Sequence, residues 1–155
     1  MPAKPRKSRK RSAAKSGRKP PEDPPFFIDR CLGRIEPART LKAAGVKLEL
    51  HDDHLPTDAP DDAWLRLVAQ RGWIALSKDK NLLRNQAAQV LIRTIGARVF
   101  FLTRQELKGT EMGEIFTKAL RRIKNVARTN RGGVVAQVFR DGHAKTLWGS
   151  AGKKR

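Results

Sequence analysis

The sequence has only one cysteine and no long apolar run, and these absences exclude several classes of protein. A single cysteine, Cys31, cannot form a disulfide within the chain, which suits a reducing compartment. We expect Cys31 to behave as a small buried apolar residue. No stretch approaches the ~18 apolar residues of a membrane span, and the first 24 residues lack the apolar core of a secretion signal. The sequence therefore predicts a cytoplasmic protein that does not contact a membrane.

Acidic residues are also scarce relative to basic ones. The chain carries 15 Asp and Glu against 34 Lys and Arg, which gives a formal net charge of +19 and indicates a polyanionic partner. Nine of the bases lie within residues 1–19, and three more end the chain at 153–155. Such segments have little to bury, and their like charges repel one another. We therefore expect residues 1–24 to be a basic disordered tail and 151–155 to be a basic C-terminal end.

The remaining residues, 25–150, have room for one globular domain with a core. Apolar segments typical of strands alternate along them with segments of helical periodicity. This alternation predicts an α/β domain with a mostly parallel central sheet flanked by helices. The expected strands are 26–29, 46–50, 73–77, 98–103, 134–139 and 144–148, the expected helices are 35–44, 61–70, 83–95 and 111–126, and 51–60 is expected to be a polar loop.

Acids follow three of the expected strands, and two more acids open the helix that precedes the third of these strands. In an open parallel sheet, the ligand crevice lies outside the carboxyl ends of the strands. We therefore expect these acids to gather at one edge of the sheet. The candidate site residues are Asp29, Asp61 with Asp62 as the alternative acid, and Asp79, with Asp52 and Asp53 as outer candidates.

Carboxylates gathered in this way predict a metal site. Their mutual repulsion costs stability unless a cation neutralises them. Oxygen ligands suit a hard divalent cation, Mg²⁺ or Mn²⁺, which could orient a water, make it more acidic and stabilise charge on a phosphodiester. Lys78, Lys80 and Arg84 flank the third acid and would hold a phosphate backbone.

Some of the same residues also have a purely structural interpretation. Asp61 and Asp79 stand where a carboxylate could simply cap a helix. Asp29 follows an apolar strand without a helix start beside it, so it has no evident structural role. The spacing of His51 and His54 would allow zinc binding, but no cysteine or further histidine lies near them in the sequence.

The segments FFIDRCLG and PDDAWLRLVAQRGWIALSKDK resemble the PIN-like fold, specifically the VapC-type toxin ribonucleases and their short-chain relatives, over roughly 25–150. In those relatives an Asp ends the first strand, an Asp stands three residues before an apolar or Trp residue on a helix, and a strand ends as T-x-D. Asp29 matches the first position. Asp61 matches the second, with Asp62 as an adjacent competitor, and Asp79 matches the third, with a serine in place of the commoner threonine.

This resemblance implies a metal-dependent RNA endonuclease, usually the toxin of a toxin–antitoxin pair. It implies that Asp29, Asp61 and Asp79 are the catalytic acids and the ligands of Mg²⁺ or Mn²⁺. It further implies RNA as the substrate, a cognate antitoxin protein as the partner, and often a homodimer. The sequence lacks a clear fourth acid and carries the basic tail, so the number of metals and a role other than toxin stay open.

Two other functions compete with this hypothesis. A non-enzymatic basic nucleic-acid-binding protein would use the tail for binding, and its acids would only cap helices. A receiver-like phosphoacceptor domain also places acids at strand ends, but it usually carries adjacent acids after its first strand, whereas Arg30 follows Asp29 here. The basic series of the last helix is more typical of a solvated face than of an RNA track; it comprises Arg121, Arg122, Lys124, Arg128 and Arg131.

Overall fold

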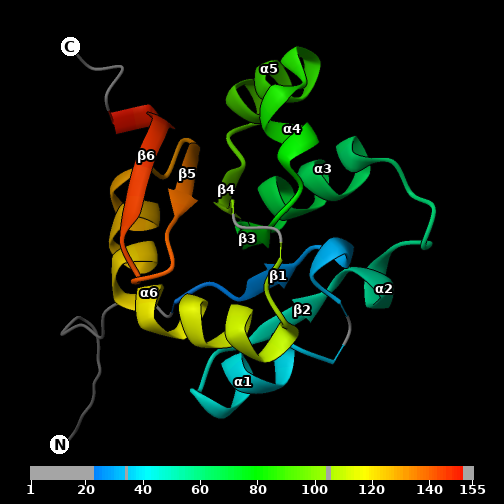
Figure 1. The fold of residues 1–155 in the computed structure, drawn as a ribbon. Coiled ribbons are helices and arrows are strands. Elements are labelled where there is room, and N and C mark those ends of the chain that lie inside the picture. Colours follow the sequence, from blue (N-terminus) through cyan, green and yellow to red (C-terminus); the bar gives the residue numbers. More distant parts are fainter. Residues whose placement is uncertain (1–22, 34, 104–105, 152–155) are drawn as a thin grey trace, which may run out of the picture.

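A computed structural model of the chain describes residues 23–33, 35–103 and 106–151, which form a six-stranded sheet with helices on both faces (Figure 1). Apart from Asp23 and Pro24, the tail expected at 1–24 lies outside the described residues, as does the C-terminal end after Ala151. In chain order the elements are β1 (Phe26–Ile28), η1 (Arg30–Leu32), α1 (Ala38–Ala43), β2 (Leu48–Leu50), α2 (His51–His54), α3 (Asp61–Arg71), β3 (Ile74–Ser77), α4 (Lys80–Arg84), α5 (Gln86–Ile95), β4 (Arg98–Leu102), α6 (Gly109–Thr129), β5 (Val134–Val138) and β6 (Ala144–Gly149).

The sheet confirms the expected architecture. Its strand order is β2-β1-β3-β4-β5-β6; the first five strands are parallel and β6 pairs antiparallel with β5. In the register of the first three strands, Ile28 lies between Leu50 of β2 and Leu76 of β3. The residues that follow these strands therefore share one edge of the sheet, which is where the acids were expected.

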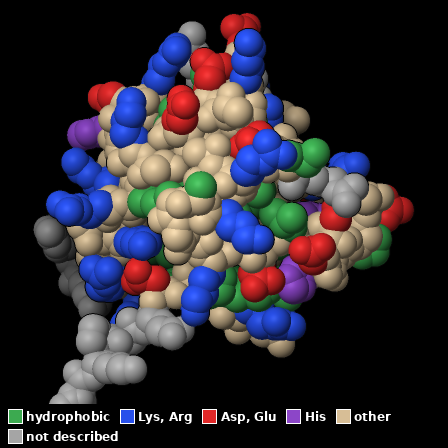
Figure 2. All heavy atoms as spheres, turned by 90° about the horizontal axis from the view of Figure 1, so that it is seen from below, with side chains coloured by type: hydrophobic (Ala, Val, Ile, Leu, Met, Phe, Trp, Pro, Cys, Tyr) green, Lys and Arg blue, Asp and Glu red, His purple; other side chains and the backbone are tan. Residues whose placement is uncertain are grey.

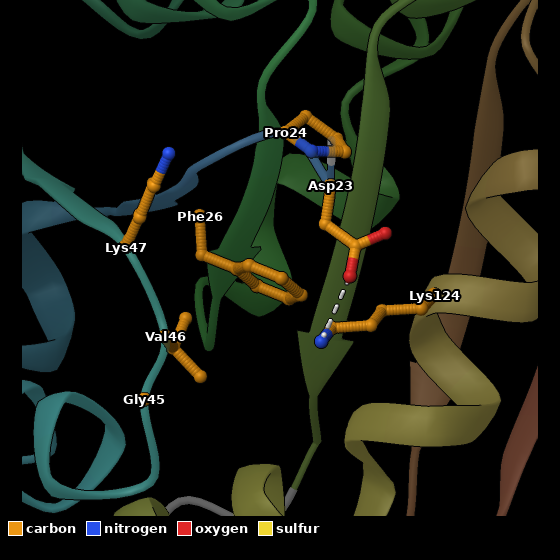
Figure 3. Close-up of a pocket in the computed structure, with 7 residues that line it drawn as sticks. All are labelled: Asp23, Pro24, Phe26, Gly45, Val46, Lys47 and Lys124. Carbon is orange, nitrogen blue, oxygen red and sulfur yellow. Dashed lines mark ion pairs between the residues drawn. The ribbon is translucent and has the colours of Figure 1, made fainter. Parts of the chain in front are cut away.

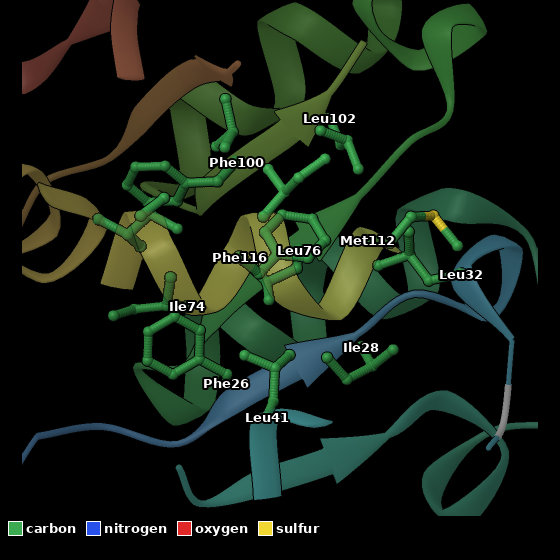
Figure 4. Packing of buried hydrophobic residues seen from close by; sticks show 14 of the residues in the cluster. Phe26, Ile28, Leu32, Leu41, Ile74, Leu76, Phe100, Leu102, Met112 and Phe116 are labelled. Carbon is green, nitrogen blue, oxygen red and sulfur yellow. The ribbon is translucent and has the colours of Figure 1, made fainter. Parts of the chain in front are cut away.

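The sheet is buried on both faces, which explains its continuous apolar strands. Helices α1 and α6 cover one face, and α3, α4 and α5 cover the other (Figure 1). Successive residues of β1 alternate between the two layers, because side chains of a strand point in opposite directions. Phe26 and Ile28 pack with Phe116 of α6 (Figure 4), whereas Phe27 packs with Trp64 of α3.

Several local expectations differ from the structure. No helix start was expected beside Asp29, but the 3-10 helix η1 begins at the next residue, although the Asp29 side chain does not cap it. The helix expected at 83–95 is two helices, because Asn85 has an extended backbone and its side chain accepts a hydrogen bond from Ala88 N at 3.0 Å, which caps α5. The segment expected to be a polar loop begins with the short helix α2, whose first residue, His51, is buried against Phe27. The helix expected at 35–44 is regular only over the bounds of α1. Within the described ranges, every helix is too short or too polar to cross a membrane.

Candidate active site

The carboxyl ends of β1 and β3 are joined by two hydrogen bonds at Asp29. Its backbone N–H donates to Leu76 O at 3.0 Å, and the Ser77 hydroxyl donates to its Oδ2 at 2.7 Å. Asp29 is only 5% exposed and Ser77 is fully buried. The hydrogen bond of Ser77 was not foreseen from the sequence, whose only signal was the position of this serine two residues before Asp79.

The surroundings of Asp29 disfavour its charged form. Burial raises the pKa of the Asp29 carboxyl above its usual range, and the nearby charge of Asp61 raises this pKa further. Hydrogen bonds from Ser77, from Cys31 and from the backbone of Arg30 lower this pKa, but by less than burial and Asp61 raise it. A cation bound beside Asp29 would therefore relieve an unfavourable buried charge.

Asp79 lies beside the same hydroxyl. Its backbone N–H donates to Ser77 Oγ at 3.1 Å, so Ser77 links Asp29 to Asp79. The Asp79 side chain accepts a hydrogen bond from Asn81 N at 2.9 Å and caps α4. The structural interpretation of Asp79 as a helix cap is thus confirmed, and a cap bonded through Oδ1 does not prevent the carboxylate from binding a cation.

The same interpretation is wrong for Asp61. Pro60 holds the N-cap position, and Asp61 is the exposed first residue of α3, which has no side-chain cap. Asp61 Oδ1 instead accepts a hydrogen bond from Trp64 Nε1 at 3.0 Å. The Trp64 ring is buried and stacks on Phe27, with ring centroids 5.6 Å apart. Asp61 is therefore held by the core, and it is close enough to Asp29 for its charge to affect the pKa of Asp29.

The other candidate acids take different partners. Asp62 is exposed, and its Oδ2 lies 3.9 Å from Arg66 Nε on the outer surface of α3. Asp52 lies on α2 with its Oδ1 3.8 Å from Arg30 Nε. Asp53 is exposed on the same short helix. Among the described residues, Asp53 and Asp62 make no side-chain contact with Asp29.

The two histidines do not point to one shared ligand. His51 is buried, and its Nδ1 lies 3.3 Å from Asp52 Oδ1. His54 Nε2 lies 2.7 Å from Glu49 Oε1. Because each ring nitrogen with a described contact faces a different carboxylate, the structure gives the zinc interpretation no support.

Cys31 differs from expectation because the residue is exposed. Its Sγ nevertheless points into the site: it donates to Asp29 Oδ2 at 3.3 Å, lies 3.5 Å from Ser77 Oγ and accepts from Lys78 N at 3.4 Å. Burial of the thiol, together with the charge of Asp29, raises its pKa to about 12. At neutral pH Cys31 is therefore a neutral donor beside the carboxylate.

The expected bases lie at the mouth of the site. Lys78, Lys80 and Arg84 line an open hollow of about 540 Å³ together with Cys31 and Asp79. Lys80 and Arg84 are exposed. The hollow therefore combines positive charge at its rim with one candidate acid, Asp79, whose backbone is linked to Asp29 through Ser77, as a phosphate-binding site beside a metal would require.

The donor set fits a hard divalent cation that keeps most of its water. Asp29 interacts electrostatically with Asp61 and is joined to Asp79 through Ser77. Among the described residues, however, no three His, Cys, Asp or Glu side chains converge into a complete metal cage. Mg²⁺ usually binds one or two carboxylates and retains several waters, so it does not need such a cage. Carboxylate ligands without a cysteine or histidine cluster favour Mg²⁺ or Mn²⁺ over zinc.

Comparison with known proteins gives two matches. A family model described as "PIN like domain" matches residues 24–104, which contain β1 to β4 and all three acids. The curated protein "Putative ribonuclease VapC45" of Mycobacterium tuberculosis (strain ATCC 25618 / H37Rv) is 28% identical over 107 residues, which cover 66% of this chain and 78% of that protein. No solved structure gives a significant match.

Proposed function

The chain belongs to the PIN-like domain family, and on this premise we propose that it is a metal-dependent RNA endonuclease. The observation that supports this most strongly is the buried Asp29, whose pKa is raised by burial and by Asp61, at the edge where Asp79 also lies. The matched relative is named a ribonuclease, which favours RNA as the substrate. Membership of this family argues against the receiver-like alternative.

Asp29, Asp61 and Asp79 would hold Mg²⁺ or Mn²⁺. When bound, the ion supplies an acidified water for attack on the phosphodiester and neutralises the charge that develops there. The chain's own residues prepare the site before binding: Ser77 orients the Asp29 carboxylate, and Trp64 orients that of Asp61. Fixing the ligands in advance reduces the free energy needed to order them when the ion binds.

The bases at the rim of the hollow would position the substrate. Lys80 and Arg84 are exposed next to Asp79, where they can contact phosphate oxygens on either side of the scissile bond. Contacts of this kind hold the RNA in place but do not read its bases. The proposed phosphate contacts therefore do not select a base sequence, but they require an RNA segment whose backbone can enter the open hollow.

We also propose that the chain is the toxin of a toxin–antitoxin pair in the cytoplasm, that it has a cognate antitoxin protein, and that it forms a homodimer. Family membership and the name of the matched relative support this role. The division into a basic tail at 1–24, a nuclease domain at 25–150 and a basic end at 151–155 is part of the same proposal, and the distribution of charge supports it.

The test is a cleavage assay on labelled single-stranded RNA, with and without Mg²⁺ or Mn²⁺. The parent should cleave only with the metal, and Asp29→Asn and Asp79→Asn should not cleave. Asp62→Asn is the matched control, because it removes one carboxylate charge from an acid that pairs outward with Arg66. If the parent binds the RNA but leaves it intact under every metal condition, the protein is a non-enzymatic nucleic-acid-binding protein instead.

A further inference from the structure

Helix α6 carries a surface of a single charge that the proposed reaction does not use. No Asp or Glu occurs between Glu114 and Asp141, whereas several bases lie on the helix within this interval. Their spacing of three, four and seven residues brings them to one side of the helix, opposite the side that packs on the sheet. The exposed members, which we call the α6 basic face, are Lys118, Arg121, Arg122 and Arg128.

The surface of the molecule agrees with this pattern. Figure 2 shows the side formed by α1 and α6: Lys and Arg side chains gather toward the left of the view, and Asp and Glu side chains are interspersed with bases over the rest of this side. In an ordinary solvated helix, acids and bases are interspersed, so that pairs one turn apart attract each other. Lys118 has Glu114 one turn before it, but Arg121, Arg122 and Arg128 have no acid on α6 with which to form such pairs.

The charges of the α6 basic face are poorly compensated within the protein. Lys118 and Arg122 are four residues apart, which places like charges next to each other and destabilises the helix. Within the described ranges, Lys118, Arg121 and Arg122 have no ion-pair partner. The helix dipole favours Arg128 in the last turn, but it does not favour Lys118 near the middle of the helix.

The N-terminal segment joins the domain beside this face. Asp23, the first described residue, lies 3.1 Å from Lys124 Nζ and 3.8 Å from Arg128 Nη2. Figure 3 shows the Asp23–Lys124 pair across a hollow bordered by Phe26. The ion pair with Lys124 at the border of this hollow therefore places Asp23 beside the C-terminal half of α6. The sequence before Asp23, with nine bases in residues 1–19, is therefore attached next to the α6 basic face.

We propose that the α6 basic face is a second RNA-binding surface, which holds the phosphate backbone of the substrate away from the acids. The identity of the ligand as RNA rests on the proposed function. Lys118 to Arg128 spans about 15 Å along the helix, enough to face several phosphates. The face lies beyond residues 24–104, the range matched by the family model, so it belongs to a part of this chain that the family match does not cover.

The direction of α6 connects the two surfaces. The helix follows β4 and precedes the parallel strand β5, so it begins at the edge of the sheet where the acids lie and ends at the opposite edge. The α6 basic face therefore leads from the neighbourhood of the site toward Asp23. An RNA bound along it would be retained by charge while another part of the strand occupies the hollow at Asp79.

Salt-dependent binding to a labelled single-stranded RNA tests this proposal. The full chain with Asp29→Asn is compared with the same chain carrying Arg121→Gln and Arg122→Gln, in EDTA so that cleavage cannot interfere. Two lost phosphate contacts should reduce the slope of log K against log[salt] by about 1.4 and weaken binding about 20-fold at 0.1 M salt. The matched control is Arg93→Gln with Lys145→Gln, which removes two exposed charges from α5 and β6 and should leave the slope nearly unchanged.

Equal slopes for the α6 variant and the control variant would overturn the proposal. The proposal would also be overturned if polyglutamate bound the Asp29→Asn chain as tightly as the RNA does and lost as much affinity in the α6 variant. That result would assign the α6 basic face to an acidic protein partner. Cleavage is measured separately, with proteins that keep Asp29 and with an RNA too short to reach beyond the hollow. On this short RNA, the variant with Arg121→Gln and Arg122→Gln should cleave at the parent rate. Absence of cleavage there would refute the proposed reaction but leave the binding result standing.

Discussion

Trp64 Nε1 donates a 3.0 Å hydrogen bond to Asp61 Oδ1, and this bond ties an exposed acid at the start of α3 to a ring buried in the core. The ring stacks on Phe27, which lies two residues before Asp29. The position of Asp61 relative to Asp29 is therefore set by packing between α3 and β1. The hydrogen bond to Trp64 thus fixes the orientation of the Asp61 carboxylate although this carboxylate does not cap the helix.

Trp64→Phe should weaken metal binding more than it weakens the fold. The phenyl ring preserves the stack on Phe27 but cannot donate to Asp61, and loss of a partner that orients a ligand typically costs about tenfold in metal affinity or activity. The measurement is the Mn²⁺ concentration that gives half-maximal cleavage. Trp73→Phe is the control, because Trp73 also stacks on Phe27, at 6.1 Å, without a described contact to an acid. Equal midpoints for the two variants would show that the hydrogen bond does not position a ligand.

Asp29→Asn should make the metal-free protein more stable above the acidic range. The folded-state pKa of Asp29 is raised above its ordinary value of 3.8, so deprotonation costs stability as the pH rises through the interval between 3.8 and the folded pKa. An uncharged Asn escapes this loss. Melting curves of both proteins in EDTA across that interval should therefore diverge as the pH increases.

The same variant should lose its response to metal. If Asp29 is a ligand, Mn²⁺ raises the melting temperature of the parent, because it binds only the folded state, and this increase is absent in Asp29→Asn. Asp62→Asn provides the comparison for a lost charge on an acid that faces away. If Mn²⁺ raises the melting temperature of Asp29→Asn as much as that of the parent, Asp29 is not a ligand.

Ser77→Ala should disturb both Asp29 and Asp79. It removes the buried donor to Asp29 Oδ2 and the acceptor of the Asp79 N–H, and an unsatisfied buried group costs about 1–3 kcal/mol. The pKa of Asp29 should rise further, since the Ser77 hydrogen bond lowers it. We expect slower cleavage whose pH dependence is displaced upward. Ser77→Thr keeps the hydroxyl and should restore the parent profile; a Thr variant as impaired as Ala would mean that the effect comes from packing.

Asp61→Asn should show which of the adjacent acids, Asp61 or Asp62, is the metal ligand. Asn retains an oxygen that can accept from Trp64 Nε1, so the variant should melt within a few degrees of the parent. Its single-turnover cleavage should be much slower because a charged ligand is lost. Asp62→Asn, which only breaks an exposed pair with Arg66, should cleave near the parent rate. The reverse order of rates would move the ligand to Asp62.

Removal of residues 1–22 should weaken RNA binding without affecting the fold. Nine bases lie within residues 1–19, so the truncated chain should bind RNA with a smaller salt slope. Its melting temperature should stay within a few degrees of the parent value, because the described core begins at Phe26. A truncated chain without a cooperative transition would show that the tail contributes to the domain.

The sequence alone determined the architecture and the edge at which the candidate site lies. Apolar runs such as 73–77 specify strands buried on both faces, and their alternation with amphipathic segments specifies a parallel sheet covered by helices. Asp29 and Asp79 follow two of these strands directly, so their shared edge is a consequence of parallel pairing. Burial and periodicity are properties of neighbouring residues, which is why local patterns carry this information.

Only the tertiary structure decided which groups meet at that edge. Ser77 bonds to Asp29 across 48 positions because β1 and β3 pair in a particular register, and no local pattern specifies that register. Asp61 bonds to Trp64 instead of capping α3 because Pro60 occupies the N-cap position and the indole is drawn into the core beside Phe27. The exposure of Cys31 and its contact with Asp29 likewise follow from the approach of two strand ends, which depends on how the whole sheet packs.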